Sequence, residues 1–480
     1  MLIAALLIIL ILLIELAARI YETRQIAQTR VSTLSETDYA TPSFGKWLAI
    51  GGLLAAVVAL SAGLFWPLRP VGGLAVLALF VVLRATLSSQ VLAAARVSMR
   101  ARLREAIAHP EIQKARIAFY FSAPELERPE HLITWAEEIN VLEISWFVIL
   151  REPHHLKAFE EANLPTAIIV PDDTALVTCL PPLVRIVFYA NNGQKNRKML
   201  SFHPDAFHIQ LLHGDSDKPP SYSPLTQNYD LVFVAGQMGI DRYAQNGVHI
   251  PVEKFRIIGR PQVRAISNLP RDKDGGLRKV VYMPTWRGFF EDTQFSSLDR
   301  ASEIIETVLA SNERLDLHFK PHPLSYKDPL WAQFEREIRT ALNRKRPNGN
   351  QGVFREDGTS PFDLYNEADL LITDISSVMI DFLYSGKPFL VVEPHAFDAA
   401  NACKFPSLDA SYRVYSTLEN LPAQMEAAIS HDPLAKKRED VRVYAFGDYG
   451  RPPGEAFRET CLTLLNGSSG QTMTHGGRIG

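Results

Sequence analysis

The chain has 480 residues, of which 47% are hydrophobic and 21% charged, and its formal net charge is −3. The length predicts two or three domains, and the apolar content excludes a chain that is disordered throughout. The near balance of charge argues against nucleic acid as a partner, because no strongly basic field is present. Three widely spaced cysteines make neither a disulfide framework nor a Cys-x-x-Cys metal site, so we expect a reducing compartment.

Apolar runs near the N-terminus predict a membrane region over residues 1–95, with helices at about 1–20, 47–68 and 71–95. The second run is uncharged and long enough to cross a bilayer. The third run reaches that length if the Arg84 side chain snorkels to the membrane surface. The sequence is therefore consistent with either two or three membrane-spanning helices. The first run lacks the basic start and the cleavage site of a signal peptide. Basic residues flanking the runs predict a multi-pass protein of the cell (inner) membrane with its later domains in the cytoplasm.

From about residue 96 the pattern changes to that of an α/β protein, in which short apolar runs alternate with helical patterns. The predicted strands are 116–121, 144–150, 166–170, 185–189, 208–212, 231–235, 255–258, 279–283, 315–320, 370–373 and 388–392. The predicted helices of the second half are 298–311, 329–342 and 377–385. The charged, glycine-bearing segment 271–278 is typical of a linker.

These elements predict two doubly wound, Rossmann-like domains that face each other across a cleft. We expect an N-terminal acceptor domain over residues 96–265 and a C-terminal nucleotide-binding domain over 266–466. The segment 467–480 is rich in Gly, Ser and Thr and predicts a flexible tail.

The segment 368–381 carries the strongest functional signal. A buried strand is followed by Asp374, and Ser376 or Ser377 is placed to cap the next helix, which includes Asp381. The helix begins at the carboxyl edge of the sheet, where its free N–H groups and two hydroxyls suit a diphosphate. The alternative is plain helix capping without a ligand.

Two further strands end in groups suited to phosphate. The strand 279–283 runs into Pro284, Thr285, Trp286 and Arg287, and a guanidinium pairs with phosphate in bidentate fashion. A buried tryptophan with a surface arginine is the alternative.

The strand 315–320 delivers Lys320 and His322 to the same predicted edge, where two neighbouring prolines fix them. A histidine beside a cation and a diphosphate donates a hydrogen bond or acts as an acid. A structural or solvated histidine is the alternative here.

In the first domain, His213 follows a strand and Gly214 permits close backbone approach. A histidine that faces the cleft is placed to take a proton from an acceptor hydroxyl. The same segment contains Asp215 and Asp217, an Asp-x-Asp pattern that offers the oxygen ligands divalent cations prefer. We expect no metal to be required, and the pattern keeps a metal site open as an alternative.

Five motifs in this order resemble the CDP-glycerol glycerophosphotransferases of teichoic acid synthesis. They are His213-Gly214, Ile258-Gly-Arg-Pro261, Pro284-Thr-Trp-Arg287, Lys320-Pro-His-Pro323 and Ile372-Thr-Asp-Ile-Ser-Ser-Val-Met-Ile-Asp381. The resemblance implies two facing Rossmann-like domains, the glycosyltransferase-B architecture. It also implies that an acceptor hydroxyl attacks the β-phosphate of CDP-glycerol and expels CMP.

The resemblance assigns roles to residues of this chain. The catalytic residues would be His213, as the base, and His322. The donor and phosphate site would be lined by Gly214, Pro284, Thr285, Trp286, Arg287, Lys320, Asp374, Ser376, Ser377 and Asp381. Two motifs depart from the family: His-Gly-Asp-Ser-Asp-Lys replaces the usual His-Gly-Thr-Pro-Leu-Lys, and Gln262 stands where the family has an arginine.

We therefore expect a membrane-bound transferase with a nucleotide-diphosphate donor, a lipid-linked or polymeric acceptor and no resident cofactor. Three alternatives remain open. One is a sugar-nucleotide glycosyltransferase of the same architecture, making a surface polysaccharide. Another is a metal-dependent transferase that uses Asp215 and Asp217, and the third is a membrane scaffold without catalytic activity.

Overall fold

The computed structural model describes residues 97–467 apart from 98–99, 125, 127, 163, 171, 268–277, 289–294, 312–313, 357, 396, 398–404 and 448–450. The predicted membrane helices, the predicted tail and most of the predicted linker lie outside the described residues. Within the described part of the chain, no helix is both long and apolar enough to cross a membrane.

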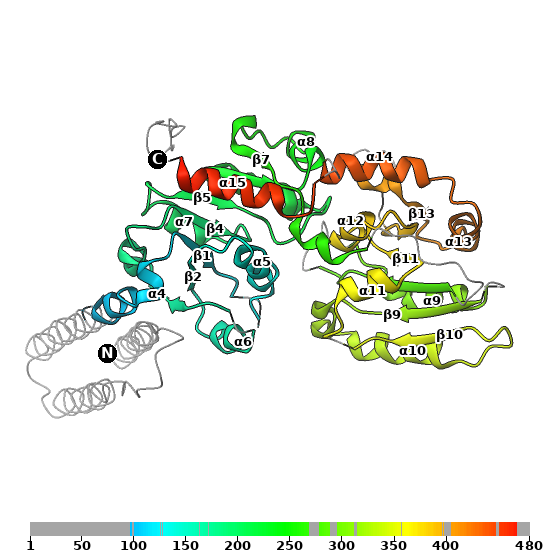
Figure 1. Cartoon of the computed structure of the whole chain (residues 1–480). Coiled ribbons are helices and arrows are strands. Elements are labelled where there is room, and N and C mark those ends of the chain that lie inside the picture. Colours follow the sequence, from blue (N-terminus) through cyan, green and yellow to red (C-terminus); the bar gives the residue numbers. More distant parts are fainter. Residues whose placement is uncertain are drawn as a thin grey trace, which may run out of the picture. The chain divides into compact units, whose positions relative to one another are not determined.

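Two sheets are built from the strands (Figure 1). The seven-stranded sheet has the order β3-β2-β1-β4-β5-β6-β7, and the six-stranded sheet has the order β10-β9-β8-β11-β12-β13. The strands of the first are β1 Ile117–Phe121, β2 Trp146–Leu150, β3 Ala167–Ile169, β4 Ile186–Tyr189, β5 Phe207–Gln210, β6 Leu231–Val234 and β7 Phe255–Ile257. Those of the second are β8 Arg278–Met283, β9 Leu315–Phe319, β10 Gln351–Phe354, β11 Leu370–Thr373, β12 Phe389–Val392 and β13 Tyr412–Val414. Both orders are those of doubly wound folds, in which ligands bind beyond the carboxyl ends of the strands.

Helices connect the strands, as parallel pairing requires. They are α4 Pro110–Gln113, α5 Glu130–Asn140, α6 His155–Glu161, α7 Asn196–Leu200, α8 Gln237–Gln245, α9 Ala301–Leu309, α10 Trp331–Asn343, α11 Pro361–Glu367, α12 Ser377–Leu383, α13 Leu421–Ser430, α14 Ala435–Phe446 and α15 Glu455–Asn466. Helices α9 and α10 pack together and against β9 and β10, as Figure 1 shows.

The central strands β11 and β12 of the six-stranded sheet are buried along their whole length, so this part of the sheet is covered on both faces. Neighbouring residues of a strand point to opposite faces. Val280 and Tyr282 therefore join a core with α9, α10 and α13, whereas Val281 and Met283 join a second core with α11, α12 and α14. All five strand pairs of this sheet are parallel, which fits strands buried on both faces.

The chain forms two compact units. Among the described residues, the first unit contains those up to Ile133, Glu143–Phe188 and Gly193–Phe207. The second contains Thr134–Leu142, Tyr189–Asn192 and the residues from His208 onward. All the predicted site residues belong to this second unit. The predicted domain boundaries at 96, 265 and 466, and the predicted cleft, stay predictions.

Most predicted elements are confirmed, with bounds shifted by one to three residues; the largest shift is at the start of α9, because Leu298–Arg300 forms a 3₁₀ turn before it. The predicted strand 370–373 is β11, and the strand 315–320 is β9 without its last residue. The edge strands β10 and β13 were not predicted. Both are short, and β10 begins with Gln351 and Gly352, residues that do not favour strands in isolation. Tertiary pairing with β9 determines its conformation.

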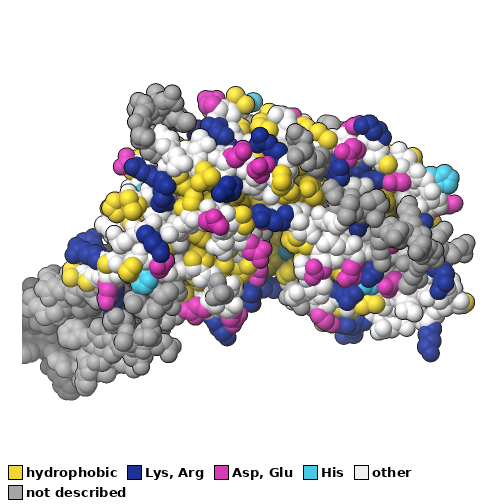
Figure 2. All heavy atoms as spheres, viewed as in Figure 1, with side chains coloured by type: hydrophobic (Ala, Val, Ile, Leu, Met, Phe, Trp, Pro, Cys, Tyr) yellow, Lys and Arg dark blue, Asp and Glu magenta, His cyan; other side chains and the backbone are white. Residues whose placement is uncertain are grey.

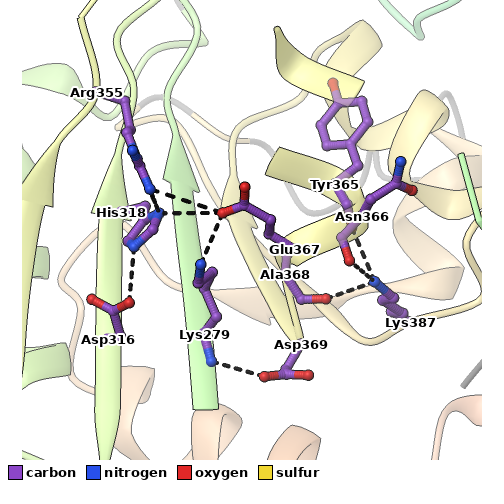
Figure 3. A network of polar contacts seen from close by, with 10 residues as sticks. All are labelled: Lys279, Asp316, His318, Arg355, Tyr365, Asn366, Glu367, Ala368, Asp369 and Lys387. Atoms are coloured by element: carbon purple, nitrogen blue, oxygen red, sulfur yellow. Dashed lines mark hydrogen bonds and ion pairs between the residues drawn. The ribbon is translucent and has the colours of Figure 1, made fainter. Parts of the chain in front are cut away.

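Polar side chains near the start of β8 and β11 form the network of Figure 3. The Lys279 ammonium lies 2.8 Å from the Glu367 carboxylate, and Asp369 accepts from the Lys279 backbone N–H at 2.8 Å. His318 contacts Asp316 through Nε2 at 2.9 Å, and its Nδ1 faces a guanidinium. Each charged side chain drawn in Figure 3 has a partner within the network. The network therefore has a structural role, which is to support β8 and β9.

Lys387 completes the same network by capping α11. Its ammonium donates to the carbonyls of Tyr365, Asn366 and Ala368 at 2.8–3.1 Å. The last carbonyls of a helix have no partner inside the helix, and a cation there also favours the helix dipole. Lys387 therefore fixes the end of α11 that leads into β11.

The surface drawn in Figure 2 carries both signs of charge. Basic and acidic side chains are interspersed on this face, and apolar side chains show between them. This mixture is consistent with the near-zero net charge of the sequence.

Candidate active site

The predicted site residues follow the carboxyl ends of four strands. His213 follows β5, Thr285 follows β8, His322 follows β9 and Ser376 follows β11. Contacts within the second compact unit join these segments to one another.

Ser376 does not act as a helix cap. It occupies the N-cap position of α12 with extended backbone, and its side chain makes no capping hydrogen bond. The residue is 5% exposed, and its Oγ has no hydrogen-bond partner among the described residues. The capping alternative therefore fails for Ser376, and because buried hydroxyls are nearly always satisfied, this hydroxyl is a candidate for binding a ligand.

Gly214 lies directly against Ser377, the first residue of α12. A Cβ atom built on Gly214 would be 3.2 Å from the Ser377 Cβ and 3.5 Å from its Oγ. The missing side chain therefore allows the segment that carries His213 to approach the serine pair, which is the close approach predicted for this glycine.

Asp374 holds the loop that follows β8. It is fully buried, and its Oδ2 accepts from the backbone N–H groups of Thr285 at 2.8 Å and Ser297 at 3.1 Å. Burial raises the pKa of Asp374 to about 6, although these hydrogen bonds and Lys218 oppose the rise. We infer that Asp374 positions Thr285. Direct phosphate binding by this acid stays a prediction.

Lys218 is a site residue that the sequence did not single out. Its ammonium donates to the Thr285 hydroxyl at 2.9 Å and lies 5.5 Å from the Phe295 ring centroid. Desolvation lowers the pKa of Lys218 to about 8, while Asp374 opposes this. The available signal was the lysine that ends the motif His-Gly-Asp-Ser-Asp-Lys, where the family also has a lysine.

His213 has the tautomer that a general base needs. Its Nδ1 lies 3.1 Å from the Ala190 carbonyl oxygen, which can only accept, so Nδ1 carries the proton and Nε2 a lone pair. The side chain is solvent-accessible, yet the surrounding protein desolvates it and, with Arg260 nearby, lowers its pKa. His213 is thus neutral near pH 7 and able to accept a proton.

The backbone before His213 is held in an unusual conformation. Leu212 has φ 57°, in the left-handed region that bulky residues avoid. Its N–H donates to the Gln210 side chain at 3.0 Å, and its carbonyl accepts from the Trp135 indole at 2.6 Å. Strain of this kind persists where surrounding contacts impose it, and here it sets the direction of the histidine.

Helix α15 supports Trp135 from behind. The Phe457 ring on α15 lies 5.6 Å from the Trp135 ring and 6.2 Å from that of Phe233, measured between centroids. Phe457 and Trp135 are 1% and 3% exposed. The last described helix is therefore part of the packing that fixes the segment before His213.

His322 is a neutral hydrogen-bond donor. Its Nδ1 accepts from the Leu324 N–H at 3.1 Å, so the proton of the neutral ring is on Nε2. Desolvation, together with the nearby charges of Lys218 and Lys320, lowers the pKa of His322 to about 3. The ring lies 6.4 Å from that of Trp286. His322 suits phosphate binding through Nε2–H, and an acid role would need a bound anion to raise its pKa.

Four of the predicted donor-binding residues are ion-paired or buried within the protein. Their assigned roles in donor binding therefore stay predictions. Arg287 forms an ion pair with Asp328 at 3.5 Å. Asp381 pairs with both sides of the Arg260 guanidinium, with 3.0 Å between Arg260 Nη2 and Oδ2. Pro284 and Lys320 are buried.

Asp215 and Asp217 are both engaged by Arg242, which is 1% exposed. Arg242 donates to Asp215 from Nη1 and to Asp217 from Nε, the latter at 2.9 Å. Asp217 also accepts from the N–H and hydroxyl of Ser407. No cluster of three or more metal-ligating side chains is found in the described part of the chain. The Asp-x-Asp pattern thus forms a buried ion network.

One protein family matches the chain. Residues 259–399 match the family described as CDP-Glycerol:Poly(glycerophosphate) glycerophosphotransferase. The matched range contains the motifs after β8, β9 and β11, and it confirms the resemblance that the sequence motifs predict. No curated protein matches the chain.

Solved structures resemble this chain at low sequence identity. A putative UDP-N-acetylglucosamine 2-epimerase from Listeria monocytogenes is 12% identical with a TM-score of 0.51, over 73% of this chain and 96% of that one. The wall teichoic acid polymerase TagF is 13% identical with a TM-score of 0.44, over 78% of this chain and 96% of that one. The first of these likenesses supports the glycosyltransferase-B-like pair of parallel sheets.

Proposed function

We propose that this member of the CDP-glycerol glycerophosphotransferase family transfers glycerol phosphate or a related polyol phosphate from a CDP-polyol. The premise is the match of residues 259–399 to that family. The single observation that carries the proposal is the buried Ser376 hydroxyl, which has no partner among the described residues. Ser376 occupies the N-cap position of α12, directly before Ser377, the residue that Gly214 approaches. A phosphate oxygen of the donor is the acceptor atom that this hydroxyl lacks.

In the proposed reaction, His213 Nε2 takes the proton of the acceptor hydroxyl, and the oxygen of that hydroxyl attacks the β-phosphorus of CDP-glycerol. The bond between that phosphorus and the bridging oxygen breaks, and CMP leaves with the bonding electrons. Transfer of a phosphoryl group depends chiefly on positioning and charge stabilisation. Lys218 supplies a cation, and His322 supplies an Nε2–H donor.

We propose that the acceptor is lipid-linked or polymeric and that the N-terminal apolar runs hold the enzyme at the inner membrane. The support is the sequence of those runs and the basic residues that flank them. Such an arrangement would present the acceptor to a cytoplasmic active site for cell-envelope polymer synthesis.

A thermal-shift panel on the full chain in detergent tests the donor. The ligands are CDP-glycerol, CDP-ribitol, UDP-sugars and CMP-sugars, each with the native chain and with Ser376→Ala. We expect a rise in Tm with a CDP-polyol, by ligand linkage, and a smaller rise in the variant. A rise with UDP-sugars alone would favour a sugar-nucleotide glycosyltransferase, and equal rises in both chains would reject the serine assignment.

A further inference from the structure

A small pocket lies beside the segment that carries His213. It is bordered by Gly214 and by apolar walls from Trp135 and Phe233, and its polar lining includes Gln262 and Arg242. Its cavity volume of about 30 Å³ gives room for roughly two water-sized groups, since one such group needs about 10–15 Å³. The pocket therefore has room for one carbon with one hydroxyl.

Gln262 enters this pocket as an unsatisfied amide. It is 5% exposed, and neither its Oε1 nor its Nε2 has a hydrogen-bond partner among the described residues. A buried side-chain amide without any partner is unfavourable, because nothing compensates the loss of its hydrogen bonds to water. A structure that keeps such a residue at a pocket indicates a ligand that satisfies it.

The pocket is polar, and both guanidinium groups that line it, those of Arg242 and Arg260, are paired with carboxylates. The Arg242 Nη2 atom, also buried, has no partner in the described structure. The Arg242 charge is matched by the carboxylates of Asp215 and Asp217, and Asp215 itself lines the pocket. A negatively charged group is disfavoured beside that carboxylate. A hydroxyl fits, because it can donate to the Gln262 Oε1 and accept from an N–H group.

We propose that this pocket binds a non-reacting hydroxyl of a polyol, together with the carbon that bears it, and that Gln262 determines specificity for it. The inference rests on the proposed function. Seating that hydroxyl beside Gly214 leaves the neighbouring hydroxyl of the same polyol near His213. The family has an arginine where this chain has Gln262, so the exchange replaces a fixed cation by a neutral group that can both donate and accept.

Steady-state kinetics with the full chain test the proposal. The probes are an acceptor ending in glycerol and one ending in propane-1,3-diol, which lacks the secondary hydroxyl, and correspondingly CDP-glycerol and CDP-propanediol. We expect the native enzyme to prefer the glycerol-ended acceptor in kcat/KM by roughly tenfold, the effect of one or two hydrogen bonds. Gln262→Leu should lose that preference while its affinity for CDP-glycerol stays unchanged.

The exposed Gln227 provides the matched control, since Gln227→Leu should keep the native preference. If Gln262→Leu loses discrimination between the two donors instead, the polyol pocket stands and its occupant is the donor glycerol. If Gln262→Leu keeps both preferences, the pocket assignment is overturned. Absence of turnover with any CDP-polyol in the native chain would instead reject the proposed function, so the two failures are distinguishable.

Discussion

Removing the Asp217 carboxylate should destabilise the fold, because this group belongs to a buried ion network. Asp217 is 1% exposed, pairs with Arg242 at 2.9 Å and accepts two hydrogen bonds from Ser407. Asp217→Ala leaves the guanidinium with one carboxylate and leaves Ser407 without its acceptor. Breaking a buried pair from one side costs about 3–5 kcal/mol, and we expect a loss of free energy of unfolding in that range.

The assay is urea unfolding of the full chain in detergent, with the midpoint and the slope fitted together. A loss of this size is large against the 5–15 kcal/mol typical of a domain. Asp217→Asn should lose less, because an amide oxygen still accepts from Ser407. The matched control is Asp440→Ala, which removes an exposed pair with Lys436 at 2.8 Å and should cost at most about 0.5 kcal/mol.

A cost below about 1 kcal/mol for Asp217→Ala would refute the reasoning, since a buried guanidinium would then tolerate the loss of half its counter-charge. Chelation provides a second test. If Asp215 and Asp217 were metal ligands, treatment of the native chain with a chelator would lower the unfolding midpoint, whereas the ion network predicts no change.

Three further predictions concern the active site. His213→Ala should lower kcat by roughly 10²–10⁴-fold, the usual contribution of a general base, with CDP-glycerol affinity retained, and normal turnover would remove His213 from that role. Lys218 has a pKa of about 8, so its charge is present below that pH and lost above it. Calorimetric titration should show donor affinity falling by about tenfold between pH 7 and 9.5, the loss of a charge-assisted hydrogen bond, and a profile unchanged in Lys218→Met would contradict this. Trp135→Phe removes the bond to the Leu212 carbonyl at 2.6 Å, so kcat should fall roughly fivefold at unchanged donor affinity; equal changes in both would indicate a general structural role.

The sequence predicted the parts of the fold that depend on local pattern. Apolar runs without alternation identified the central strands, since those strands are buried on both faces. The motif residues were found because each follows such a strand, and parallel strands bring their carboxyl ends to one edge. Thr285 and Ser376 are examples, and both are buried where the motifs placed them.

What the sequence did not supply is the partner of each polar group. Ser376 and Asp381 stand in one motif, yet the first is unpartnered among the described residues and the second pairs with Arg260. The Asp-x-Asp pattern is equally compatible with a metal and with Arg242, which follows it in sequence on α8. Contacts between residues so far apart in sequence arise from tertiary packing, which no local pattern records.

The contact between Phe457 and Trp135 has a consequence for how the enzyme is made. Trp135 is synthesised early and Phe457 late, so the packing that supports the segment before His213 stays incomplete on the ribosome until α15 has emerged. Contacts between such distant segments also form slowly, because the intervening chain must first be brought together. A chain truncated before α15 would lack the Phe457 ring, and the Trp135 side of this packing would be left uncovered.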